Sequence, residues 1–372
     1  MTTLPPLPVA SPTIGEREQH NVLEALQSGW VSSTGPYVEA FERRFASYIG
    51  VRHAVAVSNG TVALHLALHA LGVGPGDEVI VPDLTFVATA HAVLMTGATP
   101  VFVDVDRATW CVSPAAVEKA LSQRTKAILP VHLYGQPCDM TAIEAIARRA
   151  DAFVIEDAAQ GLGATWQGRR VGGMSKAGCF SFFGNKLITT GEGGMVVTND
   201  DALAARLRSL HAHGLDPKRR YFHTELAFNY RMTNLQAALG LAQLEQIDEF
   251  LEAKRRVHGW YRERLGHLSI QLNPSSPDSA YWMSSVVLTT HIDRAHVMAR
   301  LASRGVESRP FFVPMSQMPH LCGYRAVAAD GESGCPSASE LSVSGVNLPS
   351  GCHLIEADVE RVCSALMELI RE

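Results

Sequence analysis

The chain has 372 residues, of which 47% are hydrophobic and 19% charged, so it is large enough for more than one hydrophobic core and has the composition of a folded globular protein. The net charge of −5 leaves no dominant basic surface, which argues against nucleic acid as a partner. No run of about 18 apolar residues occurs, so we expect a cytoplasmic protein with no membrane partner. Seven scattered cysteines without a C-x-x-C pair predict reduced packing residues.

From about residue 50 to 200, short β-rich runs alternate with helical segments, which is typical of a mostly parallel sheet with helices on both faces. Ser113 followed by Pro114 predicts the start of a helix, and Gly50, Gly72 and Gly214 predict helix ends. The α/β fold is expected to have seven strands in this sheet, at residues 53–57, 78–81, 100–104, 127–131, 153–156, 179–182 and 195–198.

The last third of the chain has a different pattern. Residues 233–267 are apolar at helical spacing and predict one long helix leaving the sheet. We therefore expect a large domain at 1–250 and a smaller α+β C-terminal domain at 251–372, with roughly the first 30 residues packing back on the small domain. In this small domain, strands are expected at 283–289 and 306–309, and helices at 294–304 and from Glu356 onward.

Four segments that follow or end predicted strands would meet at the carboxyl edge of the sheet, where open α/β folds bind ligands. The first is Ser58-Asn59-Gly60-Thr61, which joins a strand to a helix expected at 62–71. Backbone N–H groups at a helix N-terminus and the Thr61 hydroxyl would suit an anion such as phosphate. Taken alone, an ordinary turn with a capping threonine explains this segment equally well.

The second segment, residues 155–160, places an acidic residue at the end of a buried apolar strand. A carboxylate there is costly unless a cation pairs with it. A protonated pyridine nitrogen would be such a cation, and Asp157 would keep it charged so that the ring withdraws electrons. An aspartate that merely caps the next turn is the alternative reading.

The third segment, residues 180–194, contains a single lysine, Lys186, among apolar residues and glycines. Burial would lower the pKa of this amine and make it nucleophilic, as Schiff-base chemistry requires. An exposed loop lysine fits poorly beside three phenylalanines. The fourth segment, residues 83–89, offers Phe86, which could lie flat over an aromatic cofactor or simply belong to the core.

His65 and His69 lie four residues apart on an expected helix and could bind a metal ion from one face. The helix is nearly all apolar, however, and has no third ligand nearby. We therefore expect packed neutral histidines and no metal.

With these segments in view, the chain resembles the DegT/DnrJ/EryC1/StrS family of sugar aminotransferases over nearly its whole length. The resemblance implies the type I aminotransferase fold, that of aspartate aminotransferase, and the cofactor pyridoxal 5′-phosphate (PLP), with pyridoxamine 5′-phosphate as intermediate. It also implies a homodimer with active sites built from both subunits. The matching motifs occur in the family's order, at residues 58–61, 156–160, 181–186 and 228–234.

The resemblance implies a role for each site residue. Lys186 holds the cofactor as a Schiff base, and a lysine here favours transamination over the dehydration of relatives that carry histidine. Asp157 pairs with the pyridine nitrogen, Gln160 contacts the ring hydroxyl or stacks near it, and Phe86 lies against the ring. The phosphate is held by Gly60, Thr61 and Ser181, together with Asn229 of the partner subunit.

Within the family, the likeness is greatest to enzymes that transfer the amino group of L-glutamate to C4 of GDP-4-keto-6-deoxymannose, giving GDP-perosamine. It runs through residues 30–33, 131–137, 219–221 and 307–310. One departure is Ser316, where those enzymes tend to carry histidine. The alternatives are a dTDP- or UDP-linked keto-sugar, the cyclitol ketone scyllo-inosose, or a non-catalytic sensor of the same fold; a nicotinamide dehydrogenase is disfavoured because no G-x-G-x-x-G follows the first strand.

Overall fold

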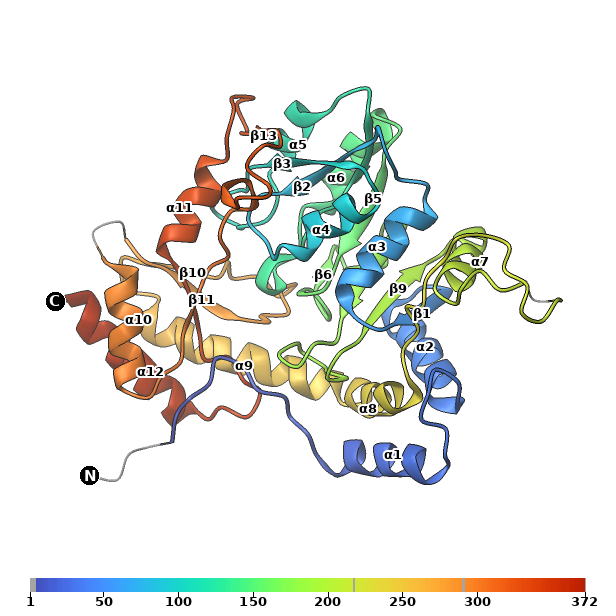
Figure 1. Ribbon diagram of the computed structural model, residues 1–372. Coiled ribbons are helices and arrows are strands. Elements are labelled where there is room, and N and C mark those ends of the chain that lie inside the picture. Colours follow the sequence, from blue (N-terminus) through green and yellow to red (C-terminus); the bar gives the residue numbers. More distant parts are fainter. Residues whose placement is uncertain (1–4, 217, 290–291, 372) are drawn as a thin grey trace.

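The computed structural model describes residues 5–216, 218–289 and 292–371 (Figure 1). Its centre is an eight-stranded sheet in the order β1-β9-β8-β5-β4-β2-β3-β13. β9 runs antiparallel to both of its neighbours, and all other neighbours pair in parallel. The strands are β1 (His53–Val57), β2 (Glu78–Pro82), β3 (Thr99–Val103), β4 (Thr125–Ile128), β5 (Phe153–Asp157), β8 (Ala177–Ser181), β9 (Gly194–Thr198) and β13 (Ala326–Val327).

All seven predicted strands are present, and the sheet gains an eighth from the C-terminal part of the chain. This extra strand, β13, pairs in parallel with β3 and is flanked by two hydrogen bonds, from Phe102 N to Arg325 O at 2.9 Å and from Asp104 N to Val327 O at 3.0 Å. A strand of two residues has no hydrophobic period, so the sequence pattern could not reveal it.

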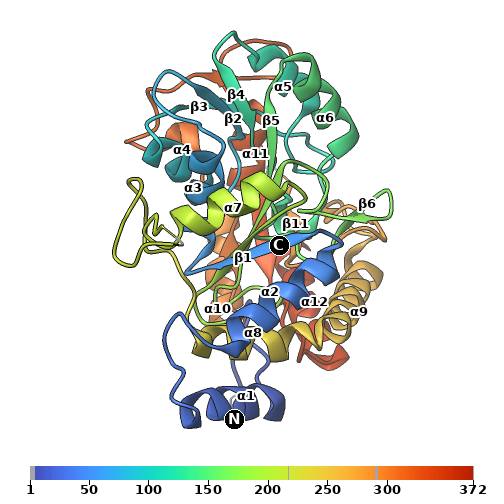
Figure 2. The same cartoon turned by 90° about the vertical axis from the view of Figure 1, so that its right-hand side faces the viewer.

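Helices cover both faces of the sheet, as expected (Figure 2). Alternate residues of each strand point to opposite faces, and Ile80 and Val81 of β2 accordingly belong to different cores. As predicted, Ser113 caps a helix, because its Oγ accepts a hydrogen bond from Ala116 N at 3.4 Å. One face carries α3 (Gly60–Ala70), α4 (Ala88–Met95) and α7 (Asp201–Leu210), and the other α2 (Pro36–Ile49), α5 (Pro114–Ala120) and α6 (Met140–Arg149).

The prediction of one long helix over 233–267 is wrong. The chain instead forms α8 (Asn234–Leu244) and α9 (Ile247–Leu265), with a break at Gln246. The helical spacing of apolar residues continues through the break, since Leu244 and Ile247 are both buried. At the break, Gln246 Nε2 donates to Glu18 Oε1 at 2.7 Å and so ties the two helices to α1 (Glu16–Gln27).

A second sheet is antiparallel, in the order β10-β11-β14-β12, and packs against α9, α10 and α12. The strand predicted at 306–309 is shifted, because Val306 pairs with Leu7 of the N-terminal segment instead of joining this sheet. The bounds here are β10 (Gln271–Leu272), β11 (Ser284–Val287), α10 (Arg294–Ser303), β12 (Arg309–Pro310), α11 (Pro336–Ser344), β14 (Gly345–Leu348) and α12 (Glu356–Arg371). Shorter elements are the hairpin β6 (Thr165–Trp166) and β7 (Arg169–Arg170), with 3₁₀ turns η1 (Leu133–Gly135) and η2 (Met315–Gln317).

The N-terminal segment lies along both parts of the molecule. Leu7 N donates to Gly305 O at 2.8 Å and Glu307 N donates to Leu7 O at 2.9 Å, beside the small sheet. Further along, α1 packs on α8 at the base of the molecule (Figures 1 and 2). The division into 1–250 and 251–372 stays a prediction; it would cut α9.

All seven cysteines are free thiols. Five are buried, but Cys322 is exposed, so the expectation that all of them are packing residues is wrong for this one. Among the described residues, no helix is both long and apolar enough to cross a membrane.

Candidate active site

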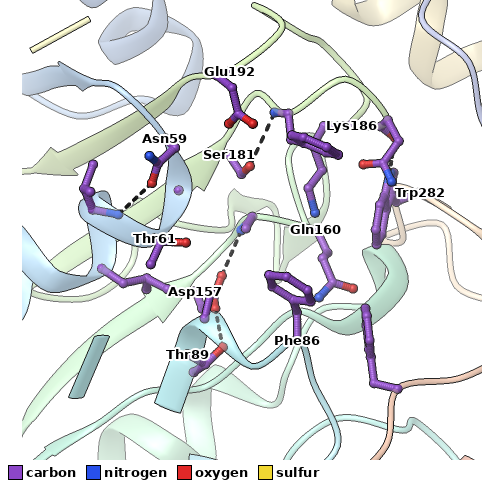
Figure 3. A pocket seen from close by; sticks show the side chains of 18 of the residues that line it. Asn59, Thr61, Phe86, Thr89, Asp157, Gln160, Ser181, Lys186, Glu192 and Trp282 are labelled. Atoms are coloured by element: carbon purple, nitrogen blue, oxygen red, sulfur yellow. Dashed lines mark hydrogen bonds between the residues drawn. The ribbon is translucent and has the colours of Figure 1, made fainter. Parts of the chain in front are cut away.

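A cavity of about 620 Å³ opens at the carboxyl edge of the large sheet (Figure 3). The four predicted segments all contribute to its wall. Of the eight residues predicted to bind a cofactor, seven line it: Gly60, Thr61, Phe86, Asp157, Gln160, Ser181 and Lys186. Other lining residues include Asn59, Thr89, Phe183, Asn185, Glu192, Trp282, Arg309 and Phe312.

One end of the cavity is the N-terminus of α3. Asn59 caps this helix by accepting a hydrogen bond from Val62 N at 3.0 Å, which leaves the N–H groups of Gly60 and Thr61 to a ligand. Gly60 lies against Ser181, where an added Cβ would be 2.7 Å from Ser181 Cβ. Only glycine allows this close approach, so the N–H groups and the two hydroxyls gather in a small site suited to phosphate.

The floor of the cavity is the end of β5. Asp157 is buried, and its carboxylate accepts hydrogen bonds from Thr89 Oγ1 at 2.9 Å and Ala159 N at 3.1 Å. Burial raises its pKa, while the hydrogen bonds and the nearby Lys186 oppose that rise. A nearby cation would stabilise the charged form of this carboxylate, and a protonated pyridine nitrogen would be such a cation.

Lys186 supplies the amine. Its side chain is partly buried and points into the cavity toward Gln160 and Trp282 (Figure 3). Burial lowers the pKa of Lys186 to about 8, and Asp157 acts in the opposite direction. A substantial neutral fraction near physiological pH makes this amine a nucleophile and a base.

The remaining predicted residues, Gln160, Phe86 and Asn229, differ in how they lie relative to the cavity. Gln160 Oε1 accepts from Tyr134 N at 3.1 Å, so its amide nitrogen is the group it can offer a ligand. Phe86 lines the cavity but is 55% exposed. Asn229 is exposed and lies outside this cavity; its Oδ1 accepts from Arg231 Nε at 3.2 Å. Its predicted place in the partner's site stays a prediction.

A sequence model of the DegT/DnrJ/EryC1/StrS aminotransferase family matches residues 12–367. This chain belongs to that family.

Members of this family align with the chain over nearly the full length of both proteins. A protein named GDP-perosamine synthase from Caulobacter vibrioides is 48% identical over 378 residues, covering 100% of both chains. Another of that name from Escherichia coli O157:H7 is 44% identical over 97% of this chain and 98% of its own. The crystal structure of DesV from S. venezuelae superposes with a TM-score of 0.91 at 35% identity, covering 99% of this chain and 100% of that one.

The family assignment and these neighbours make the chain a PLP-dependent aminotransferase of the type I fold. The DegT-family cavity fits the cofactor in three independent places. The helix N-terminus suits its phosphate, the underpaired Asp157 suits its pyridine nitrogen, and the amine of Lys186, with its lowered pKa, suits its aldehyde. Each of these groups lines one continuous cavity.

Trp282 and Thr89 line the cavity and have no role in the sequence predictions. Trp282 places its ring over the amine, with Lys186 Nζ 3.9 Å from the ring centroid. Its Nε1 donates to Asn185 O at 2.8 Å. Thr89 binds Asp157. Trp282 lies 96 residues after Lys186 and outside every motif, in a segment without glycine, so no local pattern marks it. Thr89 belongs to the fourth segment, where the sequence does not distinguish it from an ordinary helix residue.

His65 packs as an ordinary core residue. Its Nδ1 lies 3.1 Å from Tyr230 Oη and its ring meets Phe228 edge-on. Burial, followed by the neighbouring His69, lowers its pKa. Within the described ranges, no cluster of three or more His, Cys, Asp or Glu side chains is arranged to hold a metal ion.

Ser316, the departure noted in the sequence, serves the buried Asp83. Its Oγ and its backbone N each donate to that carboxylate at 2.7 Å. This pair joins η2 to the end of β2, and Ser316 is not among the cavity-lining residues.

Proposed function

We propose that this chain transfers the amino group of L-glutamate to C4 of GDP-4-keto-6-deoxymannose, giving GDP-perosamine and 2-oxoglutarate. The observation that carries the aminotransferase chemistry is that Lys186 and Asp157 face one cavity, the first with a lowered pKa and the second with a raised one. The choice of sugar is supported by the full-length similarity to the two GDP-perosamine synthases.

The roles of the residues follow from their surroundings. Bound PLP supplies an aldehyde that bonds to amines and a ring that withdraws electrons from the substrate carbon. Lys186 would hold this aldehyde. Once freed by the substrate amine, its Nζ would take the proton from the carbon of the amino donor and give it up to the cofactor, and in the second half-reaction it would carry a proton back to the sugar carbon. Asp157 would keep the ring nitrogen charged, and Gly60, Thr61 and Ser181 would bind the phosphate.

The substrate test is a parallel assay. Purified protein receives PLP and L-glutamate with GDP-4-keto-6-deoxymannose, its dTDP or UDP counterpart, or scyllo-inosose, and mass spectrometry follows the aminated product and 2-oxoglutarate. We expect the GDP sugar to be turned over at least about tenfold faster, because a pocket built around one nucleotide leaves its polar groups unpaired with another. Lys186→Ala is the control for protein-independent amination.

Other outcomes of this assay select among the alternatives. Faster turnover of scyllo-inosose would make the protein a cyclitol aminotransferase, and faster turnover of a dTDP or UDP sugar would change the nucleotide. Turnover of none of them, in a protein that binds PLP, would support a non-catalytic sensor.

We further propose a homodimer with shared active sites, acting in the cytoplasm. Large apolar side chains on the surface support an interface: Phe86 and Phe183 at the cavity are exposed, as are Trp30 and Val31 after α1. Asn229 would then reach the phosphate of the partner's cavity, as the family resemblance implies.

Mixing subunits tests this arrangement. Asn229→Asp would repel the phosphate, and Lys186→Ala removes the amine, so each variant alone is expected to be inactive. If the sites are shared, mixed dimers contain one site with both defects and one intact site, and equal mixing should restore roughly a quarter of wild-type activity. No recovery in confirmed mixed dimers would contradict a shared site; sedimentation measures the oligomer.

A further inference from the structure

The segment 279–283 contributes Trp282 to the wall of the cavity beside the amine. Trp282 is 6% exposed, covers Lys186 Nζ with its ring, and is anchored by its Nε1 to Asn185 O, the residue before the lysine (Figure 3). The indole therefore separates the amine from the protein surface on this side.

The backbone of this segment is held in an unfavourable conformation. Tyr281 has a φ of 46°, a left-handed value that residues other than glycine rarely adopt. Gly135 packs directly against it, because an added Cβ would lie 2.6 Å from Trp282 N. Ala280 N donates to Gly135 O at 2.9 Å. Such a conformation persists only where surrounding contacts fix it.

Helix α9 supplies contacts from the other side. Lys254 is 4% exposed, and its Nζ donates to Trp282 O at 3.0 Å and to Ser350 O at 2.5 Å. Among the described residues it forms no ion pair with a carboxylate. One turn further along α9, His258 stacks on Tyr281 with ring centroids 3.9 Å apart. Burying an unpaired ammonium is costly, so packing alone would favour an apolar residue at position 254.

We propose that Lys254 is a positioning residue for the reaction: by holding Trp282 O, it fixes the indole that covers the Lys186 amine. The contacts run from Lys254 Nζ to the Trp282 carbonyl, and from the Trp282 ring to Lys186 Nζ. The relevance to catalysis rests on the proposed function, in which Lys186 is the reacting amine. The covering itself is a property of the protein without cofactor.

The indole ring of Trp282 is expected to lower the basicity of the Lys186 amine. Burial is the main cause of the lowered pKa of Lys186, so removing the indole admits water and raises that pKa from about 8 toward 10.5. The attraction of the ring for the ammonium acts in the opposite direction, and the expected rise is the net result of the two effects. The other ionisable groups lining the cavity are Asp157, Glu192 and Arg309, and none of them is altered by the changes below.

The test measures the pKa of Lys186 in the full chain freed of cofactor. An amine-reactive label is applied over a range of pH, and mass spectrometry quantifies the peptide that contains Lys186. Trp282→Ala is expected to raise the pKa by at least about one unit, a tenfold smaller neutral fraction at neutral pH. Lys254→Met is expected to raise it in the same direction, whereas Lys119→Met, which changes an exposed lysine, leaves it unchanged.

The combined variant decides whether Lys254 acts through the indole. Lys254→Met should add nothing once Trp282 is already alanine, because both changes uncover the same amine. Additive shifts, or an unchanged pKa in folded Lys254→Met, would overturn the proposal. If Lys254→Met does not fold by circular dichroism, Lys254→Gln replaces it in the same cycle; its amide still donates to one carbonyl, so a smaller shift is expected and additivity would again overturn the proposal.

The outcome does not depend on the substrate, because no sugar or amino donor is present. A failed substrate assay would therefore leave these pKa values as they are. Conversely, an active aminotransferase with an unshifted Lys186 pKa in both variants would retain the proposed function and refute the positioning role.

Discussion

Two adjacent carboxylates at the end of β5 are buried alike and surrounded differently. Glu156 is 0% exposed and Asp157 is 4% exposed, and the pleat of the strand sends them to opposite sides. Glu156 accepts hydrogen bonds from His132 Nε2, Gly172 N, Met174 N and both donors of Ser175. Asp157 accepts two, from Thr89 Oγ1 and Ala159 N, and faces the cavity.

The pKa values follow these surroundings. Burial opposes ionisation of both groups. For Glu156 the hydrogen bond from His132 and the backbone donors outweigh it, so its pKa is lowered, whereas for Asp157 burial prevails and its pKa is raised. A buried carboxylate whose oxygens are all engaged stabilises the fold. One that keeps accepting capacity toward a cavity is available to a ligand cation.

The largest effect expected on the cavity side comes from Lys186, the amine that shares the cavity with Asp157. Lys186→Ala removes both the bond to the cofactor and the base, so turnover should fall by at least about 10⁴-fold. The apoprotein should unfold as cooperatively as the wild type, since the lost side chain borders a cavity. Steady-state kinetics and thermal unfolding measure the two quantities; more than a few per cent of residual turnover would contradict the role.

The next largest effect is expected from Asp157→Asn, which tests the carboxylate that faces the cavity. The amide is the same size but cannot hold a charged pyridine nitrogen, so turnover should fall roughly 10²- to 10³-fold while PLP still binds. The free energy of unfolding of the apoprotein should not decrease, because the change removes an underpaired buried charge. A variant that turns over normally but unfolds more easily would reverse the assignment of the two carboxylates.

Glu156→Gln tests the other carboxylate, whose oxygens are all engaged in hydrogen bonds inside the fold. Backbone N–H groups of three residues and the His132 donor would then meet an amide with one acceptor oxygen, leaving buried donors unpaired. We expect a loss of about 3 kcal/mol in the free energy of unfolding, measured by urea titration. His132→Phe, which removes one donor and keeps the ring, should cost less. An unchanged midpoint of urea unfolding in Glu156→Gln would contradict the structural role of Glu156.

The smallest expected effect is a pH dependence of opposite sign for the two variants. The pKa of Glu156 lies below its ordinary 4.5 in the folded chain, so its stabilisation is complete above 4.5 and is lost as pH falls through the folded value. The pKa of Asp157 lies above 3.8, so its ionisation costs stability as pH rises from 3.8 through the folded value. Relative to wild-type apoprotein, Glu156→Gln should lose and Asp157→Asn should gain stability as pH rises across these windows. Parallel pH profiles in urea titrations would contradict this.

The sequence predicts the parts of the site that are local and misses the parts that depend on distant contacts. Strand periodicity and turn residues locate the seven strands, and the segment around Lys186 contributes this residue to the cavity at the carboxyl edge of the sheet. Residues 155–160 place two carboxylates at one strand end, but which is saturated depends on donors at positions 132 and 172–175. Pattern alone does not contain that information.

The same limit explains the other differences. The break between α8 and α9 cannot be seen in the sequence because buried residues keep helical spacing across it, and the contact of Gln246 with Glu18 at the break joins positions more than two hundred residues apart. In the sequence, Lys254 is one of many charged residues of α9, and only the folded structure shows that it contacts Trp282.

The most direct test of the account compares two lysines, Lys186 and Lys254, as possible sites of the bond to PLP. Lys186 and Lys254 both have a pKa lowered by burial, but Lys254 is bound to two carbonyls and Lys186 faces the cavity. The PLP-loaded protein is reduced with borohydride and digested, and mass spectrometry locates the pyridoxyl group. The account predicts modification at Lys186, lost in Lys186→Ala; a pyridoxyl group on Lys254 or any other lysine in wild-type protein would contradict it.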